Sequence, residues 1–304
     1  MAKRGVSRRE FVKTTTAFAG ALCAPAVLRH ALAQEAQVPV RLPAHELNAD
    51  HPIVKSFKAA ILVMRGSEGR PDYHPAHWQQ LRRYHAQLCG PNGDADPRAD
   101  VHGTWWFLPW HRAYLAVVEQ LMREDSGDAT FARPYWDWHR HPKLPAIFEG
   151  DPAANPLAHA RRWLNNPEDQ ADWDRLKQYW EGLTAADEGA TVSRDAFDEF
   201  AGGPIVLGPD GPGFGTQPAV DPIHGGGHIY IGGVQGDMGA FPTAGLDPIF
   251  YCHHANLDRV WEVWRNSTPQ GAPQRKEPSD HGAEKAWSDR PFAFQDALGG
   301  AVIA

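Results

Sequence analysis

The sequence predicts a mainly α-helical fold, a helix bundle with long irregular loops and few short strands. Apolar residues recur at helical spacing in several segments, and 26 prolines and 29 glycines separate these segments without any internal repeat. The chain has 304 residues, of which 42% are hydrophobic and 11% aromatic, enough to bury one large core. We therefore expect one globular domain rather than a repeat array.

The charge pattern excludes one class of partner. The formal net charge is −7, and Lys and Arg are scattered along the chain rather than gathered in a stripe. Binding to nucleic acid requires a basic surface. We expect no nucleic-acid partner.

The first 33 residues have the features of an export signal. SRREFVK (residues 7–13) precedes a short, weakly apolar stretch and Ala31-Leu32-Ala33, an A-x-A-like cleavage site. The segment resembles the bacterial twin-arginine signal, a route that carries folded proteins. We expect removal of residues 1–33, export to the periplasm or the exterior, and no stable membrane association, since the apolar stretch is too short to span a bilayer.

Three helices are expected in the first half of the mature chain, residues 34–304. The first covers HPIVKSFKAAILVMRG and ends at Gly66, and the second covers residues 75–89, with Gly90 just after its end. The third begins near Pro109, because proline is tolerated in the first turn of a helix but not in its interior.

The second half alternates loops and helices. We expect irregular structure over residues 134–166, helical patches over 167–200, and a long glycine- and proline-rich loop over 202–227. IYIGG, residues 229–233, has the composition of a short strand. Asp247 and Pro248 open a last helix that reaches residue 265.

A first group of histidines is expected around Pro109. His102 and His111 are nine residues apart, which on one straight helix places them about 180° from each other. Because Pro109 starts the helix, His102 lies in the preceding loop and both can converge on one ion. His85 adds a third imidazole from the preceding helix. The aromatic neighbours would exclude water: Trp105, Trp106, Phe107 and Trp110.

A second group follows the glycine-rich loop. His224 and His228 are four residues apart, which on a helix puts both on one face. The zinc-protease motif needs Glu after its first His, but Gly225 stands there, so the catalytic base of that class is absent. His254 completes this group, with Phe250 and Asp258 one turn away on the same face. The adjacent His253 points about 100° away from His254.

Two groups of three histidines indicate two metal ions bound by neutral imidazoles. Cu, Zn, Fe and Ni all accept this ligand. A structural zinc site is the weakest alternative, because the motifs supply no thiolates of a closed Cys-rich site.

Two long segments narrow the choice of metal. HGTWWFLPWHRAYLAVVEQ and DPIFYCHHANLDRVWEVW resemble the two copper-binding segments of the tyrosinase, catechol oxidase and hemocyanin group, the type 3 dicopper proteins. PYWDW, NPL and HGGGHIYIGG match as well, so the resemblance covers roughly residues 75–265. It implies a dicopper centre in the core of the helix bundle, with O2 as co-substrate.

The resemblance also implies roles for single residues. Phe250 would form a wall of the active site, and His253 would support the centre without touching copper. As in plant polyphenol oxidases, Cys89 would be joined to His102 by a thioether, whereas Cys252 has no such match. The implied ligands of the two copper ions are His85, His102 and His111 for the first and His224, His228 and His254 for the second.

The implied reaction is the oxidation of a small phenol, an o-diphenol, to an o-quinone. Asp221 lies three residues before His224 and is our candidate for orienting a water that takes the phenol proton. Members of the group that hydroxylate monophenols well often have Asn after the first ligand of the second copper. Gly225 at this position indicates diphenol oxidation with weak hydroxylation of monophenols.

Two other activities share these motifs. An o-aminophenol oxidase would look the same in sequence, and an O2 carrier of the hemocyanin type uses the same copper ligands. The stretch after residue 265 is too short for the C-terminal shielding domain of plant and fungal enzymes. We therefore expect an open site, with copper loaded by a separate helper or by none. The sequence specifies neither the natural phenol nor the oligomeric state.

Overall fold

The computed structural model describes residues 39–66, 77–87, 101–102, 104–165, 169–186, 188–208, 211–214 and 218–267, together with 275, 277–278, 292–295 and 301–303. The segment Pro39–Ala304 forms one compact unit. The expected export signal and Cys89 lie outside the described residues. Within the described residues, no helix combines the length and the hydrophobicity that crossing a membrane requires.

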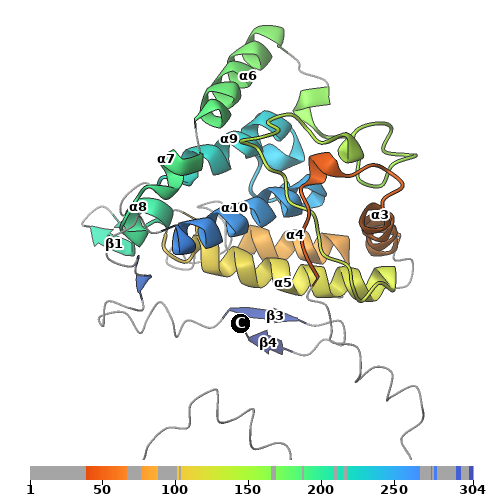
Figure 1. Ribbon diagram of the computed structural model, residues 1–304, viewed down its shortest axis with the longest axis horizontal. Helices are drawn as coiled ribbons and strands as arrows, with labels where there is room; N and C mark the ends of the chain where they lie inside the picture. Colours follow the sequence, from red (N-terminus) through yellow and green to blue (C-terminus); the bar gives the residue numbers. More distant parts are fainter. Residues whose placement is uncertain are drawn as a thin grey trace, which may run out of the picture. The chain divides into compact units, whose positions relative to one another are not determined.

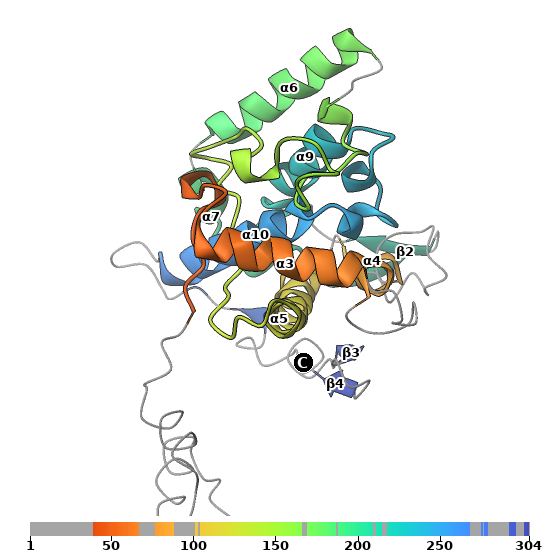
Figure 2. The same cartoon turned by 90° about the vertical axis from the view of Figure 1, so that its right-hand side faces the viewer.

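Helices make up most of the described structure, which confirms the predicted class. Helix α5 (Phe107–Ser126) contacts both α3 (Pro52–Arg65) and α10 (Ile249–Asn266). Helix α10 also contacts α9 (Asp221–Gly232), as Figures 1 and 2 show. The remaining helices are α4 (Trp78–Gln87), α6 (Gln170–Ala185), α7 (Glu188–Val192) and α8 (Phe197–Ala201).

The described strands are short, as predicted. They form two antiparallel hairpins, β1 (Ile205–Gly208) with β2 (Gly211–Phe214) and β3 (Ala293–Gln295) with β4 (Ala301–Ile303). The irregular segments contain single 3₁₀ turns: η1 (Ala44–Glu46), η3 (Ala146–Phe148), η4 (Trp163–Asn165), η5 (Asp237–Gly239) and η6 (Ala244–Leu246). Long connections with little regular structure therefore separate the helices.

Helix ends follow local sequence signals. Pro52 lies in the first turn of α3, and the His51 side chain caps that turn by accepting from the Ile53 backbone N–H. Helix α5 begins at Phe107, with Pro109 in its first turn as expected. It ends at Gly127, whose φ of 70° favours glycine over residues with a side chain.

The structure corrects two sequence expectations, since IYIGG is not a strand and the glycine-rich loop does not extend to residue 227. The end of the expected loop and most of IYIGG instead belong to α9, which begins at Asp221 and contains HGGGHIYIG. A Cβ on Gly226 would lie 2.5 Å from Leu183 Cδ1 of α6, and one on Gly227 would lie 2.5 Å from His253 Cε1 of α10. Close packing between helices therefore outweighs the low helix propensity of glycine.

A buried ion pair ties the irregular 134–165 segment to α10. Arg162 donates two hydrogen bonds to the Asp247 carboxylate, at 2.7 and 2.6 Å. Its guanidinium also donates to the backbone oxygens of Phe148 and Leu157. Asp247 Oδ1 accepts from the Ile249 N–H as well, in the first turn of α10. The pair therefore fixes the start of the helix that carries Phe250 and His254.

Replacing Asp247 by Asn tests this connection. Burial by itself raises the pKa of Asp247, but the charge and hydrogen bonds of Arg162, together with His159 and the Ile249 N–H, outweigh it, so the folded-state pKa lies below the ordinary value. The carboxylate therefore stabilises the fold above about pH 4 and loses this contribution as the pH falls further. We expect Asp247→Asn to cost about 3 kcal/mol at pH 7, because it leaves Arg162 as a buried unpaired charge.

Urea unfolding at pH 7 and pH 3 measures the effect. The difference between wild type and variant should shrink at pH 3, and Asp195→Asn, at an exposed position, serves as control. An equal difference at both pH values would contradict the role given to the ion pair.

Candidate metal centre

The six histidines predicted as ligands come together from five parts of the fold. His85 lies on α4, His102 in the segment before α5, His111 on α5, His224 and His228 on α9, and His254 on α10. Each is at most 8% exposed. The close packing of α5, α9 and α10 thus creates a cluster that no single segment could form.

The rings form two neighbouring sets of three. In the first set, ring centroids are 5.2 Å apart for His85 and His102, 5.0 Å for His102 and His111, and 5.8 Å for His85 and His111. In the second set the centroids are 4.7 Å apart for His224 and His228, 5.2 Å for His224 and His254, and 5.4 Å for His228 and His254. The His111 and His254 rings stack at 4.1 Å, so the two sets adjoin.

Backbone carbonyls orient three of the rings. The Nδ1 atoms of His85, His111 and His228 lie 3.0, 2.8 and 2.7 Å from the carbonyl oxygens of Phe241, Phe107 and Met238. Because a carbonyl only accepts, each Nδ1 carries the proton and each Nε2 offers a lone pair.

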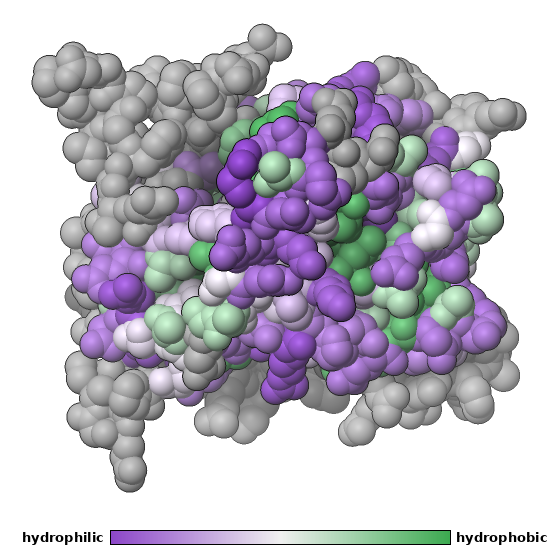
Figure 3. All heavy atoms as spheres, turned by 90° about the horizontal axis from the view of Figure 1, so that it is seen from above, coloured by the Kyte–Doolittle hydropathy of each residue, from purple (hydrophilic) through white to green (hydrophobic). Residues whose placement is uncertain are grey.

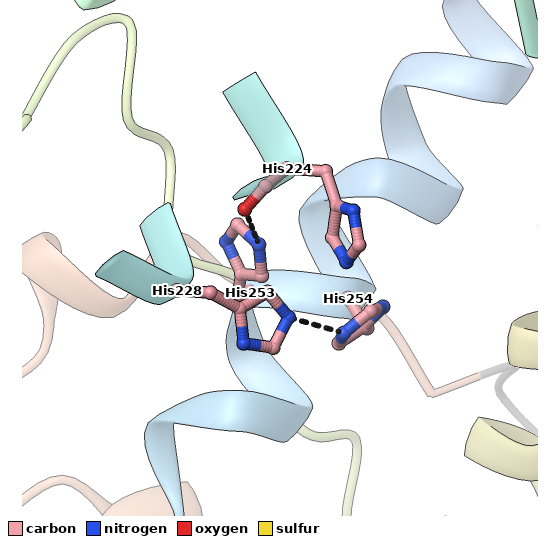
Figure 4. A group of neighbouring side chains, drawn as sticks. All are labelled: His224, His228, His253 and His254. Carbon is pink, nitrogen blue, oxygen red and sulfur yellow. Dashed lines mark hydrogen bonds between the residues drawn. The ribbon is translucent and has the colours of Figure 1, made fainter. Parts of the chain in front are cut away.

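These lone pairs have the chemistry and spacing that suit a bound cation. Among the described residues, the buried Nε2 atoms of His85, His111 and His224 have no hydrogen-bond partner. His228 Nε2 and His254 Nε2 are 3.2 Å apart, as the dashed line in Figure 4 shows. Two nitrogens that each lie about 2.0 Å from one ion in tetrahedral geometry are about 3.3 Å apart. The donor set therefore fits metal ions bound by imidazole.

The imidazoles are in the protonation state that binds metals. Burial, followed by the neighbouring imidazoles, lowers the pKa of His85, His111, His228 and His254 well below the ordinary value. Burial also lowers the pKa of His224. Neutral rings at pH 7 keep a lone pair for a metal.

His253 lies within the second set but has both ring nitrogens occupied. Trp138 Nε1 donates to its Nδ1 at 2.8 Å, and its Nε2 donates to the His224 carbonyl at 3.1 Å. The latter bond is drawn in Figure 4. An indole N–H only donates and a carbonyl only accepts, so these partners leave no lone pair for a metal. Sequence analysis missed Trp138, although it belongs to the matched PYWDW motif.

Three phenylalanines enclose the cluster. Phe250 is fully buried, with ring centroids 4.8 Å from His85 and 4.3 Å from His254. Phe107 lies 4.7 Å from His111 and 4.6 Å from His224. The Phe241 ring lies 5.3 Å from that of His102 but is 47% exposed, so it covers the site on its solvent side. No motif indicated Phe241, which lies in an irregular segment.

The remaining predicted residues have distinct positions. Asp221 Oδ1 lies 3.8 Å from His224 Nδ1, and the side chain is partly exposed. A Cβ on Gly225 would meet no atom within 4 Å, so open space adjoins this position. Asp258 does not join the cluster, because its carboxylate pairs with Arg41 and Arg112. Cys89 lies outside the described residues, and Cys252 is a buried free thiol whose pKa burial raises to about 12.

Comparison with known proteins supports the same centre. The family model "Common central domain of tyrosinase" matches residues 75–200 and 159–267. Polyphenol oxidase B, chloroplastic, from Solanum lycopersicum is 30% identical over 283 residues, covering 84% of this chain and 45% of the relative. Catechol oxidase B, chloroplastic, from Solanum tuberosum is 31% identical over 248 residues, covering 74% of this chain and 40% of the relative.

Solved structures share the fold. A latent aurone synthase, a polyphenol oxidase, superposes with a TM-score of 0.69 at 27% identity, covering 89% of this chain and 55% of that one. A functional unit of octopus hemocyanin has a TM-score of 0.53 at 22% identity, over 80% of this chain and 57% of the unit, and shares the fold alone. The chain spans less than half the length of the curated relatives cited above. Because the family model matches more than half of the chain, the chain belongs to the tyrosinase family of type 3 dicopper proteins.

Proposed function

We propose that this protein is a polyphenol oxidase that uses two copper ions and O2 to oxidise o-diphenols to o-quinones. The observation that supports this most directly is the cluster of six buried histidines in two sets of three, in which the Nε2 atoms of His85, His111 and His224 have no hydrogen-bond partner among the described residues. The similarity to polyphenol and catechol oxidases supports the same class of substrate.

The two sets would hold one copper ion each. In this proposal the first ion is bound by His85, His102 and His111 and the second by His224, His228 and His254. When bound, the copper pair supplies electron transfer between the phenol and O2. The protein contributes fixed ring orientations, because the carbonyl acceptors of Nδ1 hold three ligand rings in place before any metal arrives.

Residues around the ligands would control access and proton transfer. Phe250 and Phe107 fill the space beside the rings and exclude water from it. Asp221, partly exposed and 3.8 Å from His224 Nδ1, would orient a water that accepts the phenol proton. Gly225 offers no polar side chain to hold that water, which favours diphenols over monophenols.

Export and crosslinking complete the proposal. Residues 1–33 would direct twin-arginine export, residues 34–304 would form the mature single domain, and a thioether would join Cys89 to His102. The intact mass of the exported protein tests both points: we expect cleavage after Ala33 and the loss of two hydrogen atoms. A mature mass without that loss would exclude the crosslink.

Substrate oxidation tests the activity. We expect rapid O2 consumption and brown quinone with catechol, and slower turnover of a monophenol such as tyrosine. An O2 carrier would instead bind O2 reversibly without product, and preferential turnover of o-aminophenol would favour that alternative activity.

The Gly225→Asn variant sharpens this assay. Open space at Gly225 accommodates the new side chain, whose amide can hold the water near Asp221. We expect about a fivefold faster monophenol reaction, corresponding to one neutral hydrogen bond, with little change for catechol. Rapid monophenol turnover without a lag by the wild type would contradict the role given to Gly225.

Copper content tests the division between the two adjacent histidines. We expect His254→Ala to reduce bound copper from two ions to about one, because a ligand is lost. His253→Ala should keep both ions but weaken their binding by about ten- to a hundredfold, the usual cost of losing a group that orients a ligand.

Trp138→Phe, which removes only the donor to His253, should act in the same direction as His253→Ala. His141→Ala, at an exposed position, serves as control. Metal analysis after dialysis against a graded series of chelator concentrations measures both effects. Equal copper loss in His253→Ala and His254→Ala would show that the division is wrong.

A further inference from the structure

A cavity lies outside the cluster of six histidines. Its volume is about 630 Å³, and it is formed by the 142–165 segment together with residues of α6 and α9. This is the size of cavities that bind drug-sized molecules. None of the proposed copper ligands lines it. Figure 3 looks onto the face that carries α6 and shows apolar patches between hydrophilic side chains.

Two aromatic residues, Trp180 and Tyr230, line one wall of the cavity. The Tyr230 ring stacks on two indoles, with centroids 5.6 Å from Trp173 and 5.4 Å from Trp180. Trp180 Nε1 donates to the Pro142 carbonyl at 2.7 Å, which fixes the wall to the 142–165 segment. Because the indoles pack against the Tyr230 ring, its hydroxyl is the group that we expect to interact with a ligand. Among the described residues this hydroxyl has no hydrogen-bond partner.

A buried carboxylate orients a second polar group of the cavity. His159 Nε2 lies 2.8 Å from Asp237 Oδ2, and Asp237 is only 2% exposed. The carboxylate accepts the Nε2 proton, which leaves the Nδ1 side of the ring for a ligand hydroxyl. Asn165, which also lines the cavity, adds a side-chain amide.

The charges around the cavity balance. Two lysines, Lys143 and Lys177, are matched by two glutamates, Glu149 and Glu181, and Lys177 lies 3.8 Å from Glu181. A charged ligand would therefore meet no net attraction. The apolar side chains of Leu144 and Leu164 favour a flat apolar ring over a sugar.

We propose that this cavity is a second binding site for an uncharged, hydroxyl-bearing aromatic molecule, a phenol, separate from the copper centre. A phenol fits the apolar walls and exchanges hydrogen bonds with Tyr230 and His159. The choice of a phenol over other hydroxyl-bearing aromatics rests on the proposed function, whereas the site itself rests on the cavity.

A binding experiment tests the proposal without turnover. The copper-loaded enzyme is saturated with tropolone, a bidentate copper ligand, and titrated with 4,4′-dihydroxybiphenyl, with saturation-transfer NMR as the readout. Cellobiose, also uncharged with two hydroxyl-bearing rings, forms the sugar arm. We expect the biphenyl to bind in the presence of tropolone and cellobiose not to bind.

Variants assign the binding to the cavity. Ala160→Trp fills the cavity and should abolish binding, while Tyr230→Phe removes one hydrogen bond and should weaken it about fivefold. Ala185→Trp and Tyr179→Phe, at exposed positions of α6 outside the cavity, are the matched controls. Circular dichroism establishes that each variant is folded.

The proposal would be overturned if Tyr230→Phe and Ala160→Trp, measured as two separate variants, both bound the biphenyl with wild-type affinity. If Ala160→Trp does not fold, wild-type affinity in Tyr230→Phe alone overturns it, and so does preferential binding of cellobiose. Failure to oxidise catechol would count against the proposed function only, because this titration involves no oxidation.

Discussion

Several imidazoles can share one small buried space only if their protons point outward. In three of the six rings, a backbone carbonyl holds the proton on Nδ1 and leaves the Nε2 lone pair directed inward. The carbonyls belong to Phe241, Phe107 and Met238, so the centre depends on the backbone path of irregular segments as well as on its helices. Without a cation, inward lone pairs that lack a donor destabilise the fold, and copper binding relieves this cost. The metal and the fold therefore stabilise each other.

Close contact between α9 and α10 brings the second set of histidines together. The glycines of HGGGH let α9 approach its neighbours, since a side chain on Gly227 would collide with His253. His253 fills this contact, and its Nε2 donates to the carbonyl of His224. His224 lies in the first turn of α9, after Asp221, Pro222 and Ile223. Trp138 fixes the tautomer of His253 from the irregular segment on the other side. The tautomer of His253 is thus set by Trp138 as donor and by the His224 carbonyl as acceptor. These two hydrogen bonds link the irregular segment, α10 and α9 at the proposed ligand His224.

The irregular 134–165 segment stabilises the rest of the fold at two points, one near each of its ends. Trp138 supports His253 near its beginning, and Arg162 pairs with Asp247 near its end, at the start of α10. Between these points the segment lines the cavity of about 630 Å³ that α6 and α9 complete. Helix α10, which carries Phe250 and His254, is therefore anchored at two places by a segment without regular structure. Buried polar contacts supply this anchoring, because such a segment lacks the hydrogen-bond ladder of a helix or sheet.

The sequence by itself determined the class of fold, the end of a helix at Gly66 and the start of another near Pro109. It also predicted which six histidines come together. These signals are local: turn residues, helical spacing and two long motifs. It failed for IYIGG, whose strand-like composition was overridden by packing of α9 against α6 and α10. Only the tertiary structure decided the tautomer of His253, the roles of Trp138 and Phe241, and the pairing of Asp258 with Arg41 and Arg112. These features depend on contacts between residues far apart in the chain. Spacing along one helix carries no information about which neighbours the folded chain brings to each side of a ring.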